Sequence, residues 1–118
     1  MIGDDRIQTI QGVDYLYEAD MQDGATDPLV TATLTIRNNQ SDTLTYVLQK
    51  TVTSTLVSGV GQITDSGAGD GMAVAQFYVL AAESLALSPR SFAFTVLCTT
   101  ASGANFYAAR GIWTNSQP

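Results

Sequence analysis

Four acidic residues lie close together near the start of this 118-residue chain: Asp14, Glu18, Asp20 and Asp23. Two carboxylates at a fixed separation can hydrolyse glycosidic bonds, one as general acid and the other as base or nucleophile. No pattern of apolar residues around these four predicts the pocket that such chemistry needs. We therefore interpret them as part of a solvated strand edge and the loop that follows it.

Oxygen-rich loops are the next candidates, because hard cations such as calcium take carboxylate and carbonyl ligands. Residues 20–24 together with Asp27 could surround an ion, and so could Asp65 with Asp70. Neither group has the D-x-[DN]-x-[DN]-G spacing of a calcium-binding loop. The same residue types also form turns without any metal. We expect no metal site.

Nucleophilic catalysis lacks its usual partners, since the chain contains no histidine and only one cysteine, Cys98. A catalytic serine or cysteine normally relies on a histidine base. Cys98 shares strand parity with Phe92, Phe94 and Val96, which predicts a small buried hydrophobe. The glycine-rich residues 67–71 lack the lysine of a phosphate-binding loop and precede an expected strand, so we interpret them as a turn. The sequence predicts no catalytic residue, no enzyme activity and no cofactor.

Charge excludes two further classes of partner. Eleven acidic residues against five basic ones give a net charge of −6, and the basic residues are isolated along the chain. Nucleic-acid binding needs clustered Lys and Arg, so we expect no nucleic-acid partner. No apolar run approaches the ~20 residues of a membrane-spanning helix, so we expect no membrane partner. Residues 1–5 already include two aspartates, whereas a signal peptide begins with basic residues. This start predicts synthesis in the cytoplasm.

Alternation of apolar and polar residues predicts a chain built from strands. The alternation is clearest over residues 30–37, where one face would be buried and a row of threonines would face outward. Residues 51–57 are β-branched and either continue the strand before them or pair with it. The other expected strands cover residues 13–19, 43–50, 72–80, 91–100 and 105–113.

Seven or eight short strands separated by turns predict an all-β, antiparallel β-sandwich that forms one domain over residues 1–118. Residues 81–88, which precede Pro89, predict one short helical turn. Glycines concentrated between positions 59 and 71 predict a mobile loop in the middle of the chain. The expected core consists of Leu34, Ile36, Leu44, Tyr46, Val74, Phe92, Phe94, Val96 and Ile112.

The remaining interpretation is that the chain functions by binding other proteins through its surface. The outward threonines Thr31, Thr33 and Thr35 are neutral and β-prone, which suits cross-chain pairing or lateral packing. Tyr107 and Trp113 share strand parity and are candidate interface anchors, unless a bulge at Gly111 separates them. Residues 1–9 form a possible extended arm that reaches onto a neighbour. Sandwich edges with few protective charges predict a homo-oligomer.

The order of these segments resembles the N-terminal immunoglobulin-like domain of phage baseplate upper proteins and tail-fibre proteins. The resemblance covers nearly the whole chain. The resembling parts are the opening strand at residues 10–15, the Asp/Gly loop before a proline at 20–27, residues 32–37, the glycine-rich turn, the strand after Gly71, the short turn at 82–87, the strand at 92–97, Ser102-Gly103 and the last strand through Gly111.

The resemblance implies an immunoglobulin-like fold and a function in the virion of a tailed bacteriophage. Such a domain would be a non-enzymatic structural protein that docks onto other phage structural proteins of the tail, baseplate or fibre. No further module follows Pro118 in this sequence, which makes decoration of the phage capsid the alternative. A carbohydrate-binding or adhesive module outside any virion is the second alternative.

Overall fold

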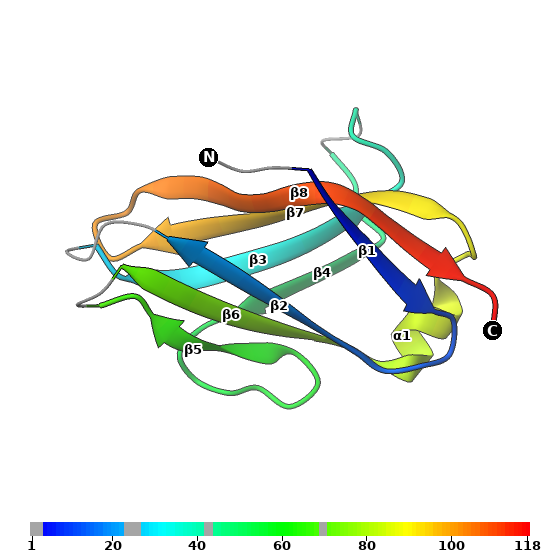
Figure 1. The fold of residues 1–118 in the computed structure, drawn as a ribbon, viewed down its shortest axis with the longest axis horizontal. Helices are drawn as coiled ribbons and strands as arrows, with labels where there is room; N and C mark the ends of the chain where they lie inside the picture. The colour runs from blue at the N-terminus through cyan, green and yellow to red at the C-terminus, as the bar shows by residue number, and fades with distance from the viewer. Residues whose placement is uncertain (1–3, 23–26, 42–43, 69–70) are drawn as a thin grey trace.

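The computed structural model describes residues 4–22, 27–41, 44–68 and 71–118, which form eight strands and one short helix (Figure 1). The elements follow the chain as β1 (Asp4–Ile10), β2 (Tyr15–Gln22), β3 (Leu29–Arg37), β4 (Leu48–Val52), β5 (Gly61–Ser66), β6 (Met72–Val79), α1 (Ala81–Ala86), β7 (Ser91–Thr100) and β8 (Asn105–Ser116).

Two sheets pack face to face around one core. The larger sheet has the strand order β1-β8-β7-β3-β4, and the smaller has the order β2-β6-β5. This arrangement is an immunoglobulin-like β-sandwich, as the sequence predicted. One edge departs from the antiparallel prediction, because β1 pairs with β8 in parallel. In Figure 1 these two strands run side by side and both point toward the end at which α1 lies.

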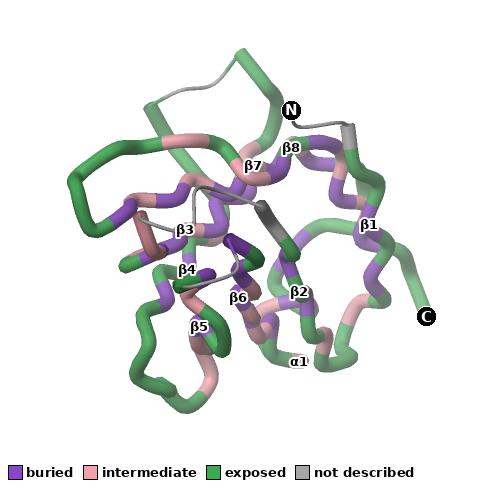
Figure 2. The backbone as a smooth tube through the Cα atoms, turned by 60° about the vertical axis from the view of Figure 1, so that its left-hand side comes forward, coloured by how far each residue is buried: buried purple, intermediate pink, exposed green. Residues whose placement is uncertain are grey.

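The core follows from alternation in neighbouring strands. Ala32, Leu34 and Ile36 on β3 lie opposite alternate residues of β7, and these inward side chains are buried. Figure 2 shows buried residues along the strands and exposed ones along the connecting loops. The core prediction is confirmed for Leu34, Ile36, Phe92, Phe94 and Val96, and Cys98 is fully buried as expected.

The core prediction is wrong for Leu44 and Tyr46, which are 92% and 56% exposed. β3 ends at Arg37, and Leu48 is paired with Ile36, so residues 44–46 lie beyond the last residue of β3 that could pair with them. A strand cannot form there without a neighbour, and β4 begins only at Leu48. Residues 51–57 likewise contribute only their first two residues to β4.

Val74 and Ile112 are the other two residues wrongly assigned to the core. Each is half-buried on the outer surface of its sheet, because the inward positions beside them belong to Ala73, Ala75 and Trp113. Both strands were predicted, but the inward face was assigned to the wrong set of residues.

β5 forms within the glycine-rich segment that was expected to be a mobile loop. Gly61 makes this possible, since a Cβ built at this position would lie 1.9 Å from the carbonyl oxygen of Gln76 on β6. The absence of a side chain lets the two backbones approach. Residues 69 and 70, at the far end of the predicted loop, lie outside the described residues.

The N-terminal segment belongs to the domain's own sheet, which corrects the prediction of an extended arm at residues 1–9. Residues 4–9 lie in β1, and Ile7 and Thr9 are buried against the core. Gly111 allows the contact, because a Cβ there would lie 1.8 Å from the backbone oxygen of Asp5. Residues 1–3 lie outside the described part of the chain.

α1 closes one end of the sandwich and confirms the single predicted helical turn. It is a six-residue helix whose first backbone amides are satisfied by carboxylates: Leu80 N donates to Glu83 Oε1 and Ala81 N donates to Asp14 Oδ1. Ser84 is fully buried, and its hydroxyl donates to the backbone oxygen of Val13, which ties α1 to the turn before β2. Within the described part of the chain, no helix is long and apolar enough to cross a bilayer.

The buried hydroxyl of Tyr17 leads us to expect that the domain loses stability at alkaline pH. Its ring packs between Phe94 and Trp113 at centroid distances of 5.8 Å, and burial, reinforced by Asp5, raises the pKa of its hydroxyl. A free tyrosine ionises near pH 10. The folded state therefore holds this proton more tightly than the unfolded state does. The stability it contributes is complete below about pH 10 and is lost as the pH rises through the folded pKa.

Absorbance titration of tyrosinate, followed together with circular dichroism, measures this effect. Part of the tyrosinate signal should appear only as the protein unfolds, because Tyr17 keeps its proton until then. Tyr17→Phe should lack this part of the signal. Ionisation of all five tyrosines in a protein that stays folded would contradict the prediction.

Candidate protein-interaction face

The outer surface of the five-stranded sheet is the strongest candidate site. Because Ala32, Leu34 and Ile36 point inward, the residues between them point outward, and the same parity holds on the neighbouring strands. Threonine is the commonest residue there, so we call this surface the threonine face. Its members include Arg6, Gln8, Ile10, Thr31, Thr33, Thr35, Arg37, Gln49, Thr51, Ser91, Ala93, Thr95, Leu97, Thr99, Asn105, Tyr107, Arg110, Ile112 and Thr114.

Polar side chains on the threonine face form hydrogen bonds with side chains on the adjacent strand. The Oγ1 atoms of Thr33 and Thr51 lie 3.0 Å apart across β3 and β4, and Gln49 Nε2 donates to Thr35 Oγ1 at 3.1 Å. On the other side of the sheet, the hydroxyls of Ser91 and Thr114 lie 3.0 Å apart. Each pair satisfies one donor and one acceptor within the sheet, so covering it with another protein costs less than burying two unpaired polar groups.

The predicted interface residues are only partly brought together. Thr31, Thr33, Thr35 and Tyr107 all lie on the threonine face. Thr31 and Thr33 are half-buried and Tyr107 is 51% exposed, whereas Thr35 is almost covered, with 4% exposure, beneath the Gln49 amide that it binds. The threonine row is therefore closely packed rather than a set of free hydroxyls.

Trp113 is not an interface residue, since it is fully buried in the core opposite Phe92. The pairing of β7 with β8 shifts by one residue: Val96 lies opposite Ala109, but Leu97 lies opposite Tyr107. This bulge puts Tyr107 and Trp113 on opposite faces of the sheet. The indole Nε1 donates to Thr9 Oγ1 at 3.1 Å, so its polar atom is also satisfied inside the domain.

The sequence interpretation missed three arginines on the threonine face: Arg6, Arg37 and Arg110. Arg37 Nη1 donates to Thr95 Oγ1 at 3.4 Å, whereas its Nε is buried and has no acceptor within the described residues. The arginines are far apart in sequence and gather only through the strand order. A visible signal was the absence of Asp and Glu from the segments that became β3, β7 and β8.

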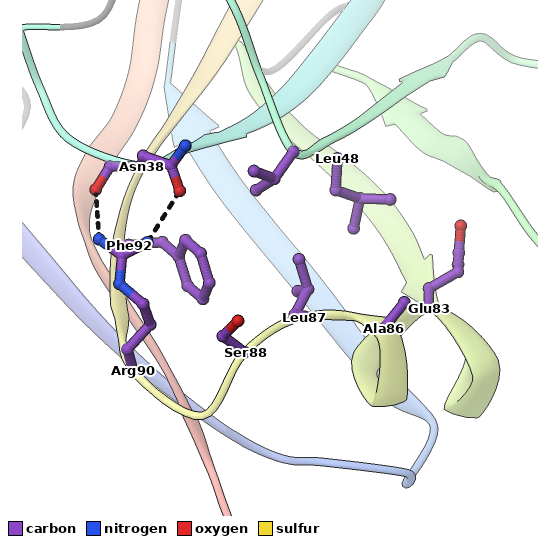
Figure 3. Close-up of a pocket in the computed structure, with 9 residues that line it drawn as sticks. Asn38, Leu48, Glu83, Ala86, Leu87, Ser88, Arg90 and Phe92 are labelled. Carbon is purple, nitrogen blue, oxygen red and sulfur yellow. Dashed lines mark hydrogen bonds between the residues drawn. The ribbon is translucent and has the colours of Figure 1, made fainter.

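A pocket of about 470 Å³ lies at the α1 end of the sandwich (Figure 3). Leu48, Leu87 and Phe92 supply apolar walls, and Arg90 and Glu83 are the charged residues of its lining. Arg90 lies over the Phe92 ring at 4.6 Å and donates from both terminal nitrogens to Asn38. Glu83 accepts a hydrogen bond from Lys50 Nζ at 2.6 Å. Both charged side chains therefore have partners within the domain.

The acidic residues considered for glycosidase chemistry have separate structural roles. Asp14 receives the amide of Ala81, and Glu18 Oε2 accepts from Gln76 Nε2 at 2.9 Å on the surface of the smaller sheet. Asp20 is exposed farther along β2. Asp23 lies outside the described residues.

The residues considered for calcium close loops instead. Asp27 accepts hydrogen bonds from Thr100 Oγ1 at 2.8 Å and from the amide and hydroxyl of Ser102 at 3.0 and 2.8 Å, which lower the pKa of its carboxyl. Asp65 Oδ1 accepts from the Gly67 amide in a tight turn. Asp70 lies outside the described residues, and the described part of the chain contains no group of three potential metal ligands.

Two solved structures that are similar to this chain illustrate the comparison with known proteins. No family model and no curated protein matches the sequence. The extracellular portion of mouse CD200RLa is similar over 98% of this chain, with 10% identity and a TM-score of 0.42, and this chain spans 56% of that one. Murine CRIg is similar over 96% of this chain and 92% of its own, with 10% identity and a TM-score of 0.44. Neither likeness bears on what the chain binds.

Proposed function

We propose that this chain is a non-enzymatic docking module that binds other structural proteins of a tailed-phage virion through its threonine face. The observation that carries the proposal is the sideways pairing of Thr33 with Thr51, of Gln49 with Thr35 and of Ser91 with Thr114. A broad sheet surface on which polar side chains pair with one another costs less to remove from water than one with unpaired polar groups.

Apolar side chains on the same surface supply the contact area that a docked protein needs. Leu97 and Ile112 are half-buried there, and Tyr107 presents a large, half-exposed ring. Aromatic residues at the centre of a covered surface carry much of the binding energy in protein interfaces. Among the described members of the threonine face, Tyr107 is the sole aromatic residue, which favours protein docking over the stacked aromatic platform of a sugar-binding site.

The virion assignment rests on the resemblance of the sequence to baseplate upper proteins and tail-fibre proteins. Attachment to the tail, baseplate or fibre is the primary form of the proposal, and decoration of the capsid is the alternative. Both forms use the same face, so they differ in the partner and not in the mechanism.

Thr33→Arg tests the proposal at the centre of the face. The new side chain points outward, so the fold should survive while a bulky charge blocks the contact. We expect affinity for the purified tail or capsid proteins encoded beside this gene to fall by roughly tenfold or more, measured by biolayer interferometry. Thr55→Arg, an identical change on an exposed loop off the face, is the matched control.

The result separates the forms of the proposal. Binding to tail proteins that Thr33→Arg weakens and Thr55→Arg leaves intact supports tail attachment, and the same pattern with capsid proteins supports decoration. Equal binding by both variants would remove the threonine face from the function. No binding by the wild-type chain to either group would overturn the docking proposal.

A further inference from the structure

Charge is segregated between the two sheets. Within the described residues, β3, β4, β7 and β8 of the larger sheet contain no Asp or Glu, whereas β2, β5 and β6 of the smaller sheet contain no Lys or Arg. In a chain of net charge −6, the larger sheet is thus locally basic apart from the acidic start of β1. Such separation produces two surfaces of opposite potential on one small domain.

On the threonine face, the basic side chains gather on one part of the sheet. Arg37 lies opposite Ala93, Ala93 lies opposite Ile112, and Ile112 lies opposite Arg6, so one row across four strands has an arginine at each end. Arg110 lies in the next row, paired with Thr95 on β7 and with Asp4 on β1. The side chains between the arginines are small or apolar.

The outer surface of the smaller sheet has the opposite character, and we call it the acidic face. Its outward side chains include Glu18 and Asp20 on β2 and Asp65 on β5. Val74 lies between Asp20 and Asp65, paired with both. A carboxylate on each side of an apolar centre matches, in reverse sign, the row that ends in arginines on the threonine face.

Apolar contacts are available on the acidic face as well. Leu16 is 44% exposed, and Tyr78, opposite it on β6, is half-buried. On the threonine face, Ala93 and Ile112 occupy the middle of the arginine row. Two such surfaces can bury apolar area at their centres while the opposite charges meet around them, which is the usual anatomy of a specific interface.

We propose that the threonine face binds the acidic face of a second copy of this chain. Because the two faces belong to opposite sides of the sandwich, each copy uses a different surface toward each neighbour, and the contact is heterologous. Copies then stack head to tail, and the stack ends in a ring if its rotation closes. The proposal rests on the docking role of the threonine face and names the partner as another copy.

Charge reversal on each face gives a sharp test. Arg37→Glu/Arg110→Glu makes both faces acidic, and Glu18→Lys/Asp20→Lys makes both faces basic. In sedimentation velocity at physiological salt, the wild-type chain should associate as its concentration rises, and each variant alone should associate roughly tenfold more weakly or not at all. Arg90→Glu, a reversal at the α1 end of the sandwich, should behave as the wild type.

An equimolar mixture of the two double variants is the decisive experiment. In the mixture, the acidic threonine face of Arg37→Glu/Arg110→Glu meets the surface that Glu18→Lys/Asp20→Lys has made basic. The mixture should regain the association that each variant lost, which misfolding of either variant would not allow. Circular dichroism and melting temperature verify the fold of each one beforehand. Failure of the mixture to associate, or loss of association in Arg90→Glu, would overturn the proposal.

The same experiment distinguishes this inference from the proposed function. A wild-type chain that stays monomeric at every concentration, but binds virion proteins through the threonine face, overturns head-to-tail stacking and retains docking. A chain that stacks as described and binds no virion protein supports the stacking and overturns the virion partner.

Discussion

Replacing Asn115 by alanine is expected to destabilise the domain by about 3 kcal/mol. Asn115 is 1% exposed, and its Nδ2 donates to the backbone oxygens of Ser84 at 2.9 Å and Leu87 at 3.0 Å. Its Oδ1 accepts from Thr9 Oγ1 at 3.0 Å. One side chain on β8 therefore connects β1 with the second half of α1 and the residue that follows it. Its removal takes a hydrogen bond from three buried polar groups, of which the Leu87 oxygen keeps Gln11 Nε2 at 3.2 Å.

The cost is large because the groups left behind cannot reach water. Each buried donor or acceptor without a partner costs about 1–3 kcal/mol, and the alanine also leaves a small cavity. Thr9 is itself the acceptor for the Trp113 indole, so the loss extends to the centre of the core. Thr9→Val should consequently be non-additive with Asn115→Ala, since both changes remove parts of one network.

Urea denaturation followed by tryptophan fluorescence measures this effect. Asn105→Ala is the matched control, because Asn105 lies on the same strand, is exposed, and binds only Thr99 among the described side-chain contacts. The control should change the free energy of unfolding by less than about 1 kcal/mol. Equal destabilisation by the two alanine variants would show that the Asn115 network contributes little.

Local alternation was sufficient to predict most of the fold. Residues 30–37 and 91–100 were predicted as strands, and they are β3 and β7, the strands that carry the centre of the larger sheet. Their buried faces depend only on which residues alternate, and the sequence displays that directly. The threonine row of the candidate site was predicted for the same reason, because it is the outward half of one strand.

Features that depend on a distant partner could not be predicted in this way. Leu44 and Tyr46 alternate as a strand would, but β3 ends before it can pair with them. Tyr107 and Trp113 share strand parity in the sequence, and the bulge in β8 that separates them is set by the register with β7. The parallel pairing of β1 depends on Gly111, more than a hundred residues away.

The opposing charges of the two faces also required the three-dimensional arrangement. Arg6, Arg37 and Arg110 are spread over the whole chain, and only the strand order places them on one surface. The ion pair of buried Lys50 and half-buried Glu83 is a second example, because it joins β4 to α1 across 33 residues. In the sequence, isolated basic residues have no visible partner, and their roles follow from topology rather than from composition.

Gly111→Ala should destabilise the domain by about 3–4 kcal/mol by displacing β1 from the sheet. A Cβ at this position would lie 1.8 Å from the Asp5 oxygen and 2.6 Å from the Asp5 nitrogen, so the backbone of β1 must move away. That movement exposes Ile7, whose burial is worth about 2 kcal/mol. It also breaks the link from Thr9 to Trp113, worth about 1 kcal/mol or more.

Hydrogen–deuterium exchange locates the damage, and the melting temperature measures its size. Amides of β1 and of the facing part of β8 should exchange faster, while those of β3 and β7 keep their protection, because the core sheet does not depend on β1 for its pairing. Gly103→Ala is the control. Gly103 has φ +91° and no atom within 4 Å of its added Cβ, so the change introduces backbone strain of about 1–2 kcal/mol without a clash.

A larger effect of Gly111→Ala than of Gly103→Ala, confined to β1 and β8, identifies close approach of the two strands as the reason for glycine at position 111. The parallel pairing of β1 with β8 would then be an integral part of the domain. The absence of a side chain at Gly111 permits it and the hydroxyl of Thr9 stabilises it, so residues 4–10 would not be free to act on a neighbouring molecule. Unchanged exchange in β1 of the Gly111→Ala variant would contradict this account and return the N-terminal segment to the role of a separable arm.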